Sequence, residues 1–221
     1  MHALLHHLNE VGFALAPRPL GLDHEGREVL GYIDGESGRD VWPLIVDDEG
    51  LASFALALRE YHRAVATYRP PATTEWAYGR HPIQPGELVC HGDFGPWNLV
   101  WRDGRPVGIL DWDLAYPGPS TDDVAYALAY ATPFRDDAHA MRWHAFPDPP
   151  DRRHRIAVFA DAYGISTNGL VDAVVERQRL TARHSRILKA RGLVAAWTTT
   201  ESVLNNDELA RWSDEHRHLF E

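Results

Sequence analysis

The sequence contains one cysteine, Cys90, and one lysine, Lys189, among its 221 residues. A single cysteine excludes an internal disulfide framework. No apolar run approaches the roughly 20 residues that a membrane-spanning helix needs, and the sequence does not open with the basic and then apolar segments of a secretory leader. It also lacks internal repeats and low-complexity tracts. These absences predict a cytoplasmic protein that has no membrane partner.

Basic residues are few as well: 22 Lys and Arg stand against 32 Asp and Glu, which gives a net charge of −10 with neutral histidines. Nucleic-acid binding depends on basic patches, so this balance argues against a nucleic-acid partner. It favours a cationic small substrate, with solubility alone as the other explanation of the charge. A hydrophobic content of 44% is ordinary for a globular chain that buries a core.

The most informative stretch is a polar loop with the pattern H-x-D-x-x-x-x-N, from His91 through Asp93 to Asn98, directly after the apolar run 88–90. A second apolar run ends in Asp111. Phosphotransferases need such a set, because one carboxylate faces the acceptor hydroxyl while an amide oxygen and a second carboxylate bind the metal that bridges to phosphate. The order and spacing of these residues therefore predict a phosphoryl-transfer site.

These residues resemble the aminoglycoside phosphotransferase / choline kinase-like family, which shares a bilobal fold with the protein kinases and carries H-G-D where they carry H-R-D. Segment 17–36 is similar to that family's strand, hinge and interlobe segment, and 58–64 to the helix before the catalytic loop. Segment 117–126 is similar to the one after the metal-binding Asp. The resemblance covers about the first 130 residues, and the rest more loosely.

In this family pattern Asp93 is the catalytic base or the group that orients the acceptor hydroxyl, although a turn Asp that caps its own loop is the simpler alternative. Asn98 and Asp111 are expected to bind Mg²⁺, which prefers oxygen ligands. Asp113 is expected to point to the same side of an extended strand as Asp111, because side chains in a strand alternate with period two. It is then expected to hold a metal-bound water or a second metal, with a solvated acid at a strand end as the alternative.

The resemblance also implies supporting residues. His91 and Asp123 are expected to brace the catalytic loop by hydrogen bonds without touching substrate. The backbone around Leu30, Tyr32 and Ile33 is expected to bind the nucleotide base at the hinge.

The predicted fold is α+β: a protein kinase-like fold with a truncated N-terminal lobe and a mostly helical C-terminal lobe. Residues 1–36 are interpreted as the remnant of the nucleotide-binding lobe with its hinge, and 37–221 as the catalytic and substrate lobe. Apolar periodicity predicts helices and alternation predicts strands. The expected helices cover 3–11, 51–66, 122–130, 153–163, 170–190 and 207–218, the expected strands cover 19–22, 28–33, 87–90, 99–101 and 106–110, and a surface loop covers 68–85.

The sequence departs from the family pattern at its beginning. Family members carry a phosphate-covering loop and a strand lysine before the first helix, whereas here eleven residues precede Gly12 and the lysine of the sequence is Lys189. Half of the nucleotide clamp is therefore expected to be missing. Three explanations stay open: a coding start placed too far downstream, a natural short form, or a degenerate member used for binding.

The leading hypothesis is a phosphotransferase that uses Mg²⁺ and moves the γ-phosphoryl group of ATP or GTP to a hydroxyl of a small molecule, with a cationic one such as an aminoglycoside as a candidate. The alternative is a non-catalytic kinase-like binding or toxin-immunity protein. A metal hydrolase built on His91, Asp93 and Asp111 is a third possibility, but it needs histidine ligands that the sequence does not clearly offer. The acceptor, the preferred nucleotide and the oligomeric state are not predicted.

Overall fold

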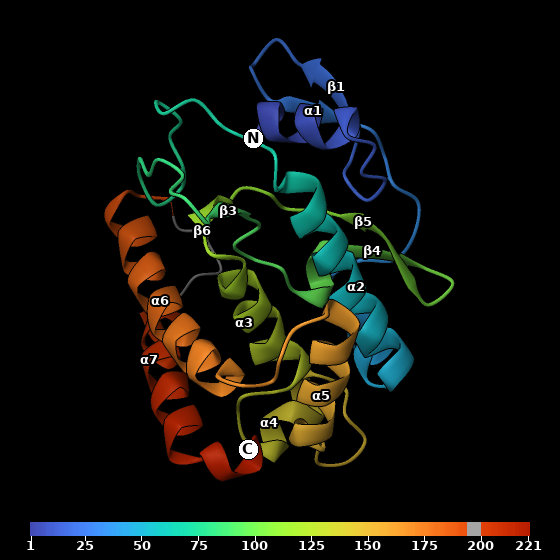
Figure 1. Cartoon of the computed structure of the whole chain (residues 1–221), viewed down its shortest axis with the longest axis vertical. Coiled ribbons are helices and arrows are strands. Elements are labelled where there is room, and N and C mark those ends of the chain that lie inside the picture. The colour runs from blue at the N-terminus through green and yellow to red at the C-terminus, as the bar shows by residue number, and fades with distance from the viewer. Residues whose placement is uncertain (194–199) are drawn as a thin grey trace.

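The computed structural model of the chain describes residues 1–193 and 200–221, in which helices predominate over three small antiparallel sheets. Helix α1 (His2–Glu10) and strand β1 (Pro19–Leu22) lie at one end of the molecule, and helix α4 (Asp137–Trp143) lies at the other (Figure 1). The predicted α+β class is confirmed by this arrangement.

The N-terminal elements are a helix and a hairpin. α1 buries Leu4, Leu5 and Leu8, whose spacing places them on one helical face, in the same apolar core as helix α2 (Asp48–Val65). β1 pairs antiparallel with strand β2 (Glu28–Leu30), and the Asp23 carboxylate accepts two backbone N–H groups of the turn between them. The division of the chain at residue 36 stays a prediction.

The segment after β2 runs along strand β4 (Leu99–Arg102). The backbone groups of Glu36 and Trp101 exchange two hydrogen bonds of 2.7 and 2.8 Å. Gly35 lies so close to this strand that a Cβ would be 2.4 Å from the Trp101 carbonyl oxygen, and its φ of +146° favours glycine. The 3-10 helix η1 (Gly38–Ile45) then leads to α2.

Helix α2 begins three residues earlier than its apolar pattern predicts, because Asp47 caps it: the carboxylate accepts the Gly50 N–H at 2.8 Å. Its buried face fills the centre of the core with Leu51, Phe54, Leu58 and Tyr61, all 0% exposed. Acidic residues in its first turn interact favourably with the positive end of the helix dipole. The helix therefore forms a rigid wall behind the central strands.

Four short strands hold the predicted catalytic loop. Strand β3 (Leu88–Cys90) pairs antiparallel with β6 (Tyr116–Gly118), and β4 (Leu99–Arg102) pairs with β5 (Arg105–Ile109). Asp103 and Gly104 turn the second hairpin with φ values of 51° and 74°, the positive values that a two-residue hairpin turn of this type needs. The loop 91–98 thus connects two small sheets.

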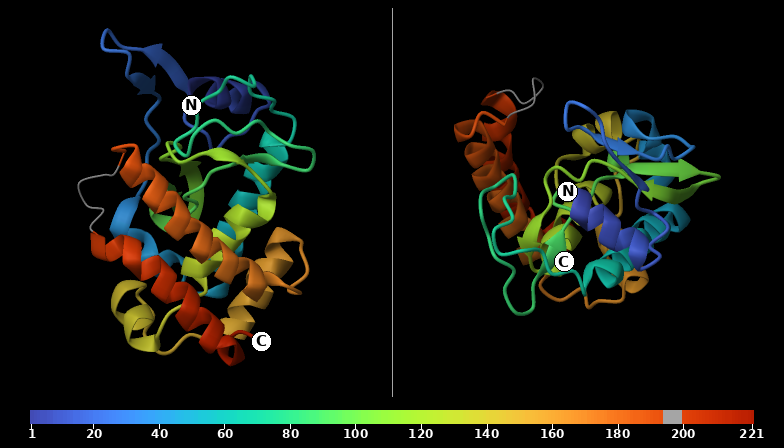
Figure 2. Two further views of the ribbon diagram at one scale, coloured as in Figure 1. Left: turned by 90° about the vertical axis from the view of Figure 1, so that its left-hand side faces the viewer. Right: turned by 90° about the horizontal axis from the view of Figure 1, so that it is seen from above.

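The rest of the described chain contains α4 and four longer helices. These are α3 (Ser120–Ala131), α5 (Arg152–Tyr163), α6 (Leu170–Ala190) and α7 (Thr200–Glu215), and the 3-10 helix η3 (Arg217–Leu219) follows α7. α3 is central and buries eight of its residues. α6 and α7 lie side by side (Figure 2).

Most predicted elements are confirmed within a few residues. The strand expected over 28–33 ends at Leu30, however, and the helix expected over 207–218 begins at Thr200. Helix α4 was not predicted, since its seven residues carry too short an apolar pattern. In the described part of the chain no helix combines the length and the apolar character that crossing a membrane requires.

Candidate functional site

The loop from His91 to Asn98 is fixed at both ends, by β3 before it and β4 after it. Gly92 adopts φ +84°, and a Cβ there would lie 2.1 Å from the carbonyl oxygen of Leu114. Only glycine permits this approach without strain. Glycine is therefore required in the H-G-D sequence, because the loop packs against the segment that leads from β5 to β6.

Asp123 lies beneath the loop and is 0% exposed. Its carboxylate accepts the backbone N–H groups of His91 at 2.7 Å and Gly92 at 2.9 Å, and His62 Nε2 lies 3.1 Å away. Burial acts to raise the pKa of the Asp123 carboxyl, but the hydrogen bond and the electrostatic attraction of His62, with the Gly92 N–H, outweigh it and lower the pKa. Asp123 is thus placed to hold the loop as an anion.

Both ring nitrogens of His91 are engaged. Nε2 donates to the carbonyl oxygen of Leu110 at 2.9 Å, and Nδ1 accepts the Asp93 backbone N–H at 3.3 Å. The ring is 0% exposed and packs against Phe94 and Trp112. No nitrogen is left for a metal, which argues against a hydrolase that uses His91 as a ligand.

The Asp93 carboxylate is oriented by two side chains. The Tyr126 hydroxyl donates to Oδ1, and Asn98 Nδ2 donates to Oδ2 at 2.8 Å. Burial raises the pKa of the Asp93 carboxyl, and these hydrogen bonds oppose part of that rise. A carboxylate that is held in one orientation and partly desolvated has the properties of a general base or of a group that orients a hydroxyl.

Asn98 is buried and its amide orientation is fixed. Nδ2 donates to both the backbone oxygen and Oδ2 of Asp93, at 2.9 and 2.8 Å. The amide oxygen Oδ1 therefore faces away from Asp93 and remains available as an acceptor or ligand. The Asn98 carbonyl oxygen accepts the Leu110 N–H at 2.7 Å, which joins this loop to the residue before Asp111.

Asp111 and Asp113 are both exposed, but they do not lie in a strand. β5 ends at Ile109, Asp111 adopts a left-handed φ of +58°, and Asp113 lies in a turn. The expectation that period-two alternation aligns the two carboxylates is therefore wrong, because the backbone turns between them. Asp111 is close enough to Asp93 for its charge to contribute to the raised pKa of Asp93.

The donors present fit a magnesium ion. The Asn98 amide oxygen and the Asp111 carboxylate are hard oxygen ligands of the kind that Mg²⁺ prefers, and Mg²⁺ commonly uses only one or two carboxylates together with phosphate and water. Among the described residues no three His, Cys, Asp or Glu side chains gather as a closed metal cluster. The set therefore suits a metal shared with a phosphate ligand better than an enclosed structural metal.

The predicted nucleotide-binding residues lie at and after the end of β2. Leu30 belongs to β2, Tyr32 is 87% exposed, and Ile33 packs over Gly108 of β5, where a Cβ would be 2.7 Å from the Ile33 side chain. The Gly31 N–H already donates to the Arg18 carbonyl oxygen at 2.8 Å. The structure thus brings Ile33 against the strand that leads to Asp111 and leaves the Tyr32 side chain in solvent.

Two residues of this site were not predicted from the sequence: Tyr126 on α3 and Arg177 on α6. Arg177 donates to the carbonyl oxygens of Gly92 at 2.8 Å and Asp122 at 3.1 Å, and its guanidinium lies 4.7 Å from the centre of the Tyr126 ring. The sequence does not show that Arg177 is buried (3% exposed), because α6 carries several other arginines. No signal in the local sequence sets Arg177 apart from these arginines.

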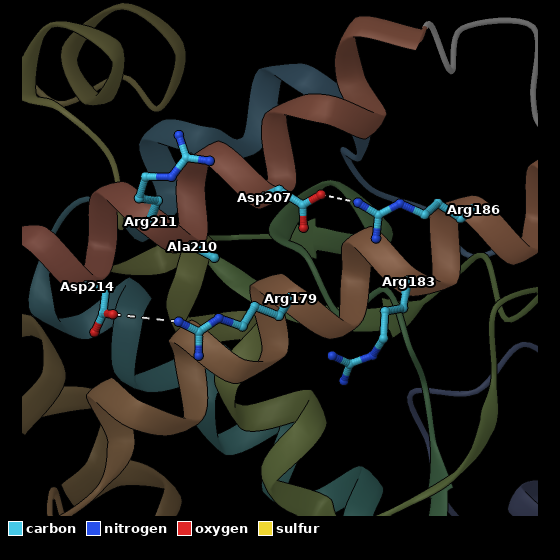
Figure 3. A pocket seen from close by; sticks show the side chains of 7 residues that line it. All are labelled: Arg179, Arg183, Arg186, Asp207, Ala210, Arg211 and Asp214. Carbon is cyan, nitrogen blue, oxygen red and sulfur yellow. Dashed lines mark hydrogen bonds and ion pairs between the residues drawn. The ribbon is translucent and has the colours of Figure 1, made fainter.

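A cleft of about 540 Å³ lies between α6 and α7 and is lined mostly by charged side chains (Figure 3). Two ion pairs cross it, Arg186 with Asp207 and Arg179 with Asp214. Arg179 and Arg186 lie about half a turn around α6 from Arg177, which faces the catalytic loop. Arg183 and Arg211 point away from one another (Figure 3). The cleft is thus a contact between two helices that ion pairs hold together, and it lies outside the site.

A profile of the "Phosphotransferase enzyme family" matches residues 78–155, which include the loop, Asp111 and Asp123. Among curated proteins, the trifolitoxin immunity protein of Rhizobium leguminosarum bv. trifolii is 35% identical over 180 residues, which are 78% of this chain and 67% of that protein. The resemblance noted in the sequence is confirmed by these matches.

Solved structures of kinases share the fold. Amicoumacin kinase hAmiN in complex with AMP-PNP, Ca²⁺ and Ami aligns over 97% of this chain and 76% of its own, with a TM-score of 0.58 and 10% identity. The gentamicin complex of APH(2″)-IIa aligns over 95% and 78%, with a TM-score of 0.57 and 10% identity. At such identities the likeness shows the fold alone, and the predicted kinase-like fold is confirmed.

Proposed function

The chain belongs to the phosphotransferase enzyme family that includes the aminoglycoside phosphotransferases, and on this premise we propose that it transfers the γ-phosphoryl group of ATP or GTP to a hydroxyl of a small molecule. The observation that carries the proposal is the orientation of Asp93. Tyr126 and Asn98 hold its two carboxylate oxygens, and Asp111 follows a residue bonded to Asn98. This is the set of groups that phosphoryl transfer requires.

In the proposed reaction Asp93 accepts a hydrogen bond from the acceptor hydroxyl and takes its proton as the bond to phosphorus forms. His91 and Asp123 keep the loop in place, since their hydrogen bonds fix the backbone on both sides of Gly92. Catalysis of this kind depends mainly on positioning and on electrostatic stabilisation. The raised pKa of Asp93 suits a group that must take up a proton.

Asn98 and Asp111 are the residues that would hold Mg²⁺, and Asp113 is a further candidate through a water or a second ion. When bound, Mg²⁺ would neutralise charge on the β- and γ-phosphates. Leu30, Tyr32 and Ile33 are proposed to receive the base through the backbone. Lys189 lies on α6, so it does not take the place of the strand lysine that clamps phosphate in the family.

Two properties of the chain bear on the class of acceptor. The net charge of −10 favours a cationic molecule such as an aminoglycoside. Around Asp93 itself, however, the described side chains include Arg177 and several aromatic rings. Acceptors should therefore be tested as a panel that includes amino sugars, amino alcohols and neutral hydroxyl compounds. We expect the reaction to take place in the cytoplasm, where ATP and GTP are available.

Phosphoryl transfer from labelled ATP or GTP to that panel, with and without Mg²⁺, tests the proposal. The wild-type chain should phosphorylate at least one acceptor, and Asp93→Ala should abolish transfer while nucleotide binding persists. Asp161→Ala is the matched control, because Asp161 is an exposed acid on α5. Equal transfer by Asp93→Ala and the wild type would remove Asp93 from its role.

The second candidate is a non-catalytic binding protein that confers immunity to a toxin, and the 35% identity to the trifolitoxin immunity protein favours it. Expression of this chain in a trifolitoxin-sensitive strain separates the two candidates. Protection that Asp93→Ala retains would support binding alone. Protection that Asp93→Ala loses and Asp161→Ala keeps would support catalysis.

A further inference from the structure

Asp93 is bound by two side chains, and only Asn98 belongs to the sequence motif. The other is Tyr126, which donates its hydroxyl proton to Oδ1 from helix α3. We propose that Tyr126 is a positioning residue for Asp93: with Arg177 behind its ring, it fixes the carboxylate in the orientation that meets the acceptor hydroxyl. This inference rests on the proposed phosphotransferase function and adds to it a residue outside the H-x-D-x-x-x-x-N pattern.

The position of Tyr126 is rigid. It lies in the middle of α3, which buries eight of its residues, and its side chain is 8% exposed. The rings of Tyr126 and Tyr130 are 5.1 Å apart between centres, which closes one side of the phenol. A tyrosine packed in this way cannot swing out when an acceptor enters, so it accompanies Asp93 throughout a catalytic cycle.

Arg177 also packs against the Tyr126 ring and connects it to the loop. Its guanidinium lies 4.7 Å from the centre of the Tyr126 ring, a distance typical of a cation–π contact. Three further bonds fix the same guanidinium, to the Gly92 and Asp122 carbonyl oxygens and to the Thr181 hydroxyl. Because Gly92 immediately precedes Asp93, one buried arginine holds both the loop backbone and the ring that orients its carboxylate.

The two donors leave the carboxylate a single orientation. Tyr126 binds Oδ1 and Asn98 binds Oδ2, so rotation about the Cβ–Cγ bond would break both hydrogen bonds. The acceptor hydroxyl must use a remaining lone pair, because each carboxylate oxygen accepts more than one bond. Preorganisation of this kind lowers the barrier of the transfer step without changing how the nucleotide binds.

Steady-state kinetics of Tyr126→Phe test the role, with Tyr68→Phe as the control because Tyr68 lies next to His7, on another part of the chain. Loss of a hydrogen bond to a charged group should lower kcat about 10- to 100-fold. KM for the nucleotide should change little, since the ring and its packing remain, and the lost hydrogen bond should lower the melting temperature only modestly. A kcat equal to that of the wild type, where Asp93→Ala is inactive, would overturn the proposal.

A spectroscopic readout tests the contact without any turnover. A buried hydroxyl proton in a hydrogen bond to a carboxylate exchanges slowly and should give a downfield proton NMR signal. The signal should disappear in both Tyr126→Phe and Asp93→Ala, and it should persist in Tyr68→Phe. A signal that persists in Asp93→Ala, or that is missing from the wild type, would contradict the contact on which the proposal rests.

The two measurements separate this inference from the proposed function. If the wild-type chain transfers phosphate to none of the acceptors, the proposed function is wrong, and so is the role of Tyr126 in transfer. The NMR signal still reports the contact between Tyr126 and Asp93 in that case. Transfer that depends on Asp93 but not on the Tyr126 hydroxyl defeats the inference alone.

Discussion

The Asp123 carboxylate accepts the backbone N–H of His91 at 2.7 Å, so a residue in the first half of α3 fixes the beginning of the catalytic-type loop. The same carboxylate accepts the Gly92 N–H, and all three groups are buried. A buried acid of this kind is stable only while its donors remain. The geometry of the loop therefore depends on a helix that follows it by some 30 residues in the sequence.

Asp123→Ala should lower the free energy of unfolding by about 3 to 5 kcal/mol, because it leaves two buried N–H groups and His62 without their acceptor. Urea denaturation monitored by circular dichroism measures the change. Asp161→Ala, which removes an exposed acid from α5, should alter stability by less than about 0.5 kcal/mol. Similar values for the two variants would show that Asp123 does not support the fold.

The pH dependence of stability should carry the signature of Asp123. Its folded pKa lies below the ordinary value, so its contribution is complete above about pH 4, the unfolded pKa, and is lost as the pH falls through the folded pKa. The stability difference between the wild type and Asp123→Asn should therefore shrink on acidification below about pH 4. A difference that stays constant between pH 7 and pH 3 would contradict the lowered pKa.

Gly92→Ala should damage the site more than the fold. Alanine at φ +84° is strained, and its Cβ would lie 2.1 Å from the Leu114 carbonyl oxygen, so the loop must move. Gly26→Ala is a matched control, since Gly26 has φ +77° with no atom within 4 Å of the added Cβ. Phosphoryl transfer should be lost in the first variant and kept in the second, and equal activity would contradict the proposed packing of the loop.

Arg155→Met should destabilise the chain by several kcal/mol. Arg155 is 4% exposed and donates to the carbonyl oxygens of Ile45 at 2.6 Å and Ala131 at 2.9 Å, so it joins the ends of η1 and α3. Loss of these donors leaves buried carbonyl groups unpaired. Arg153→Met, at an exposed arginine one position before His154, should cost far less. Thermal unfolding of both variants measures the difference.

Much of this site could be predicted because its residues lie close together in the sequence. The eight residues from His91 to Asn98 carry their own pattern, and apolar runs on either side identify the strands that hold them. The α+β class follows from helical periodicity in the second half and short alternating runs in the first. The prediction of the loop and the prediction of the fold class both depend on residues that are neighbours in the sequence, and a sequence shows such local patterns directly.

The parts that were missed depend on contacts between distant segments. Arg177 binds Gly92 across 85 residues, and nothing local marks it among the arginines of α6. Tyr126 has the apolar spacing of any buried helical residue, so its hydroxyl contact with Asp93 could not be foreseen. Asp113 was misplaced because β5 already ends at Ile109 and the backbone at Asp111 is left-handed, a conformation that nothing in the local sequence marks.

Calorimetric titration of MgATP and MgGTP into the chain tests the phosphotransferase function most directly, beside Asp111→Asn as the variant and Asp161→Asn as the control. Binding of at least one nucleotide should be saturable and require Mg²⁺, and it should be lost or strongly weakened in Asp111→Asn and unchanged in Asp161→Asn. No binding of either nucleotide, or equal binding by all three chains, would contradict that function.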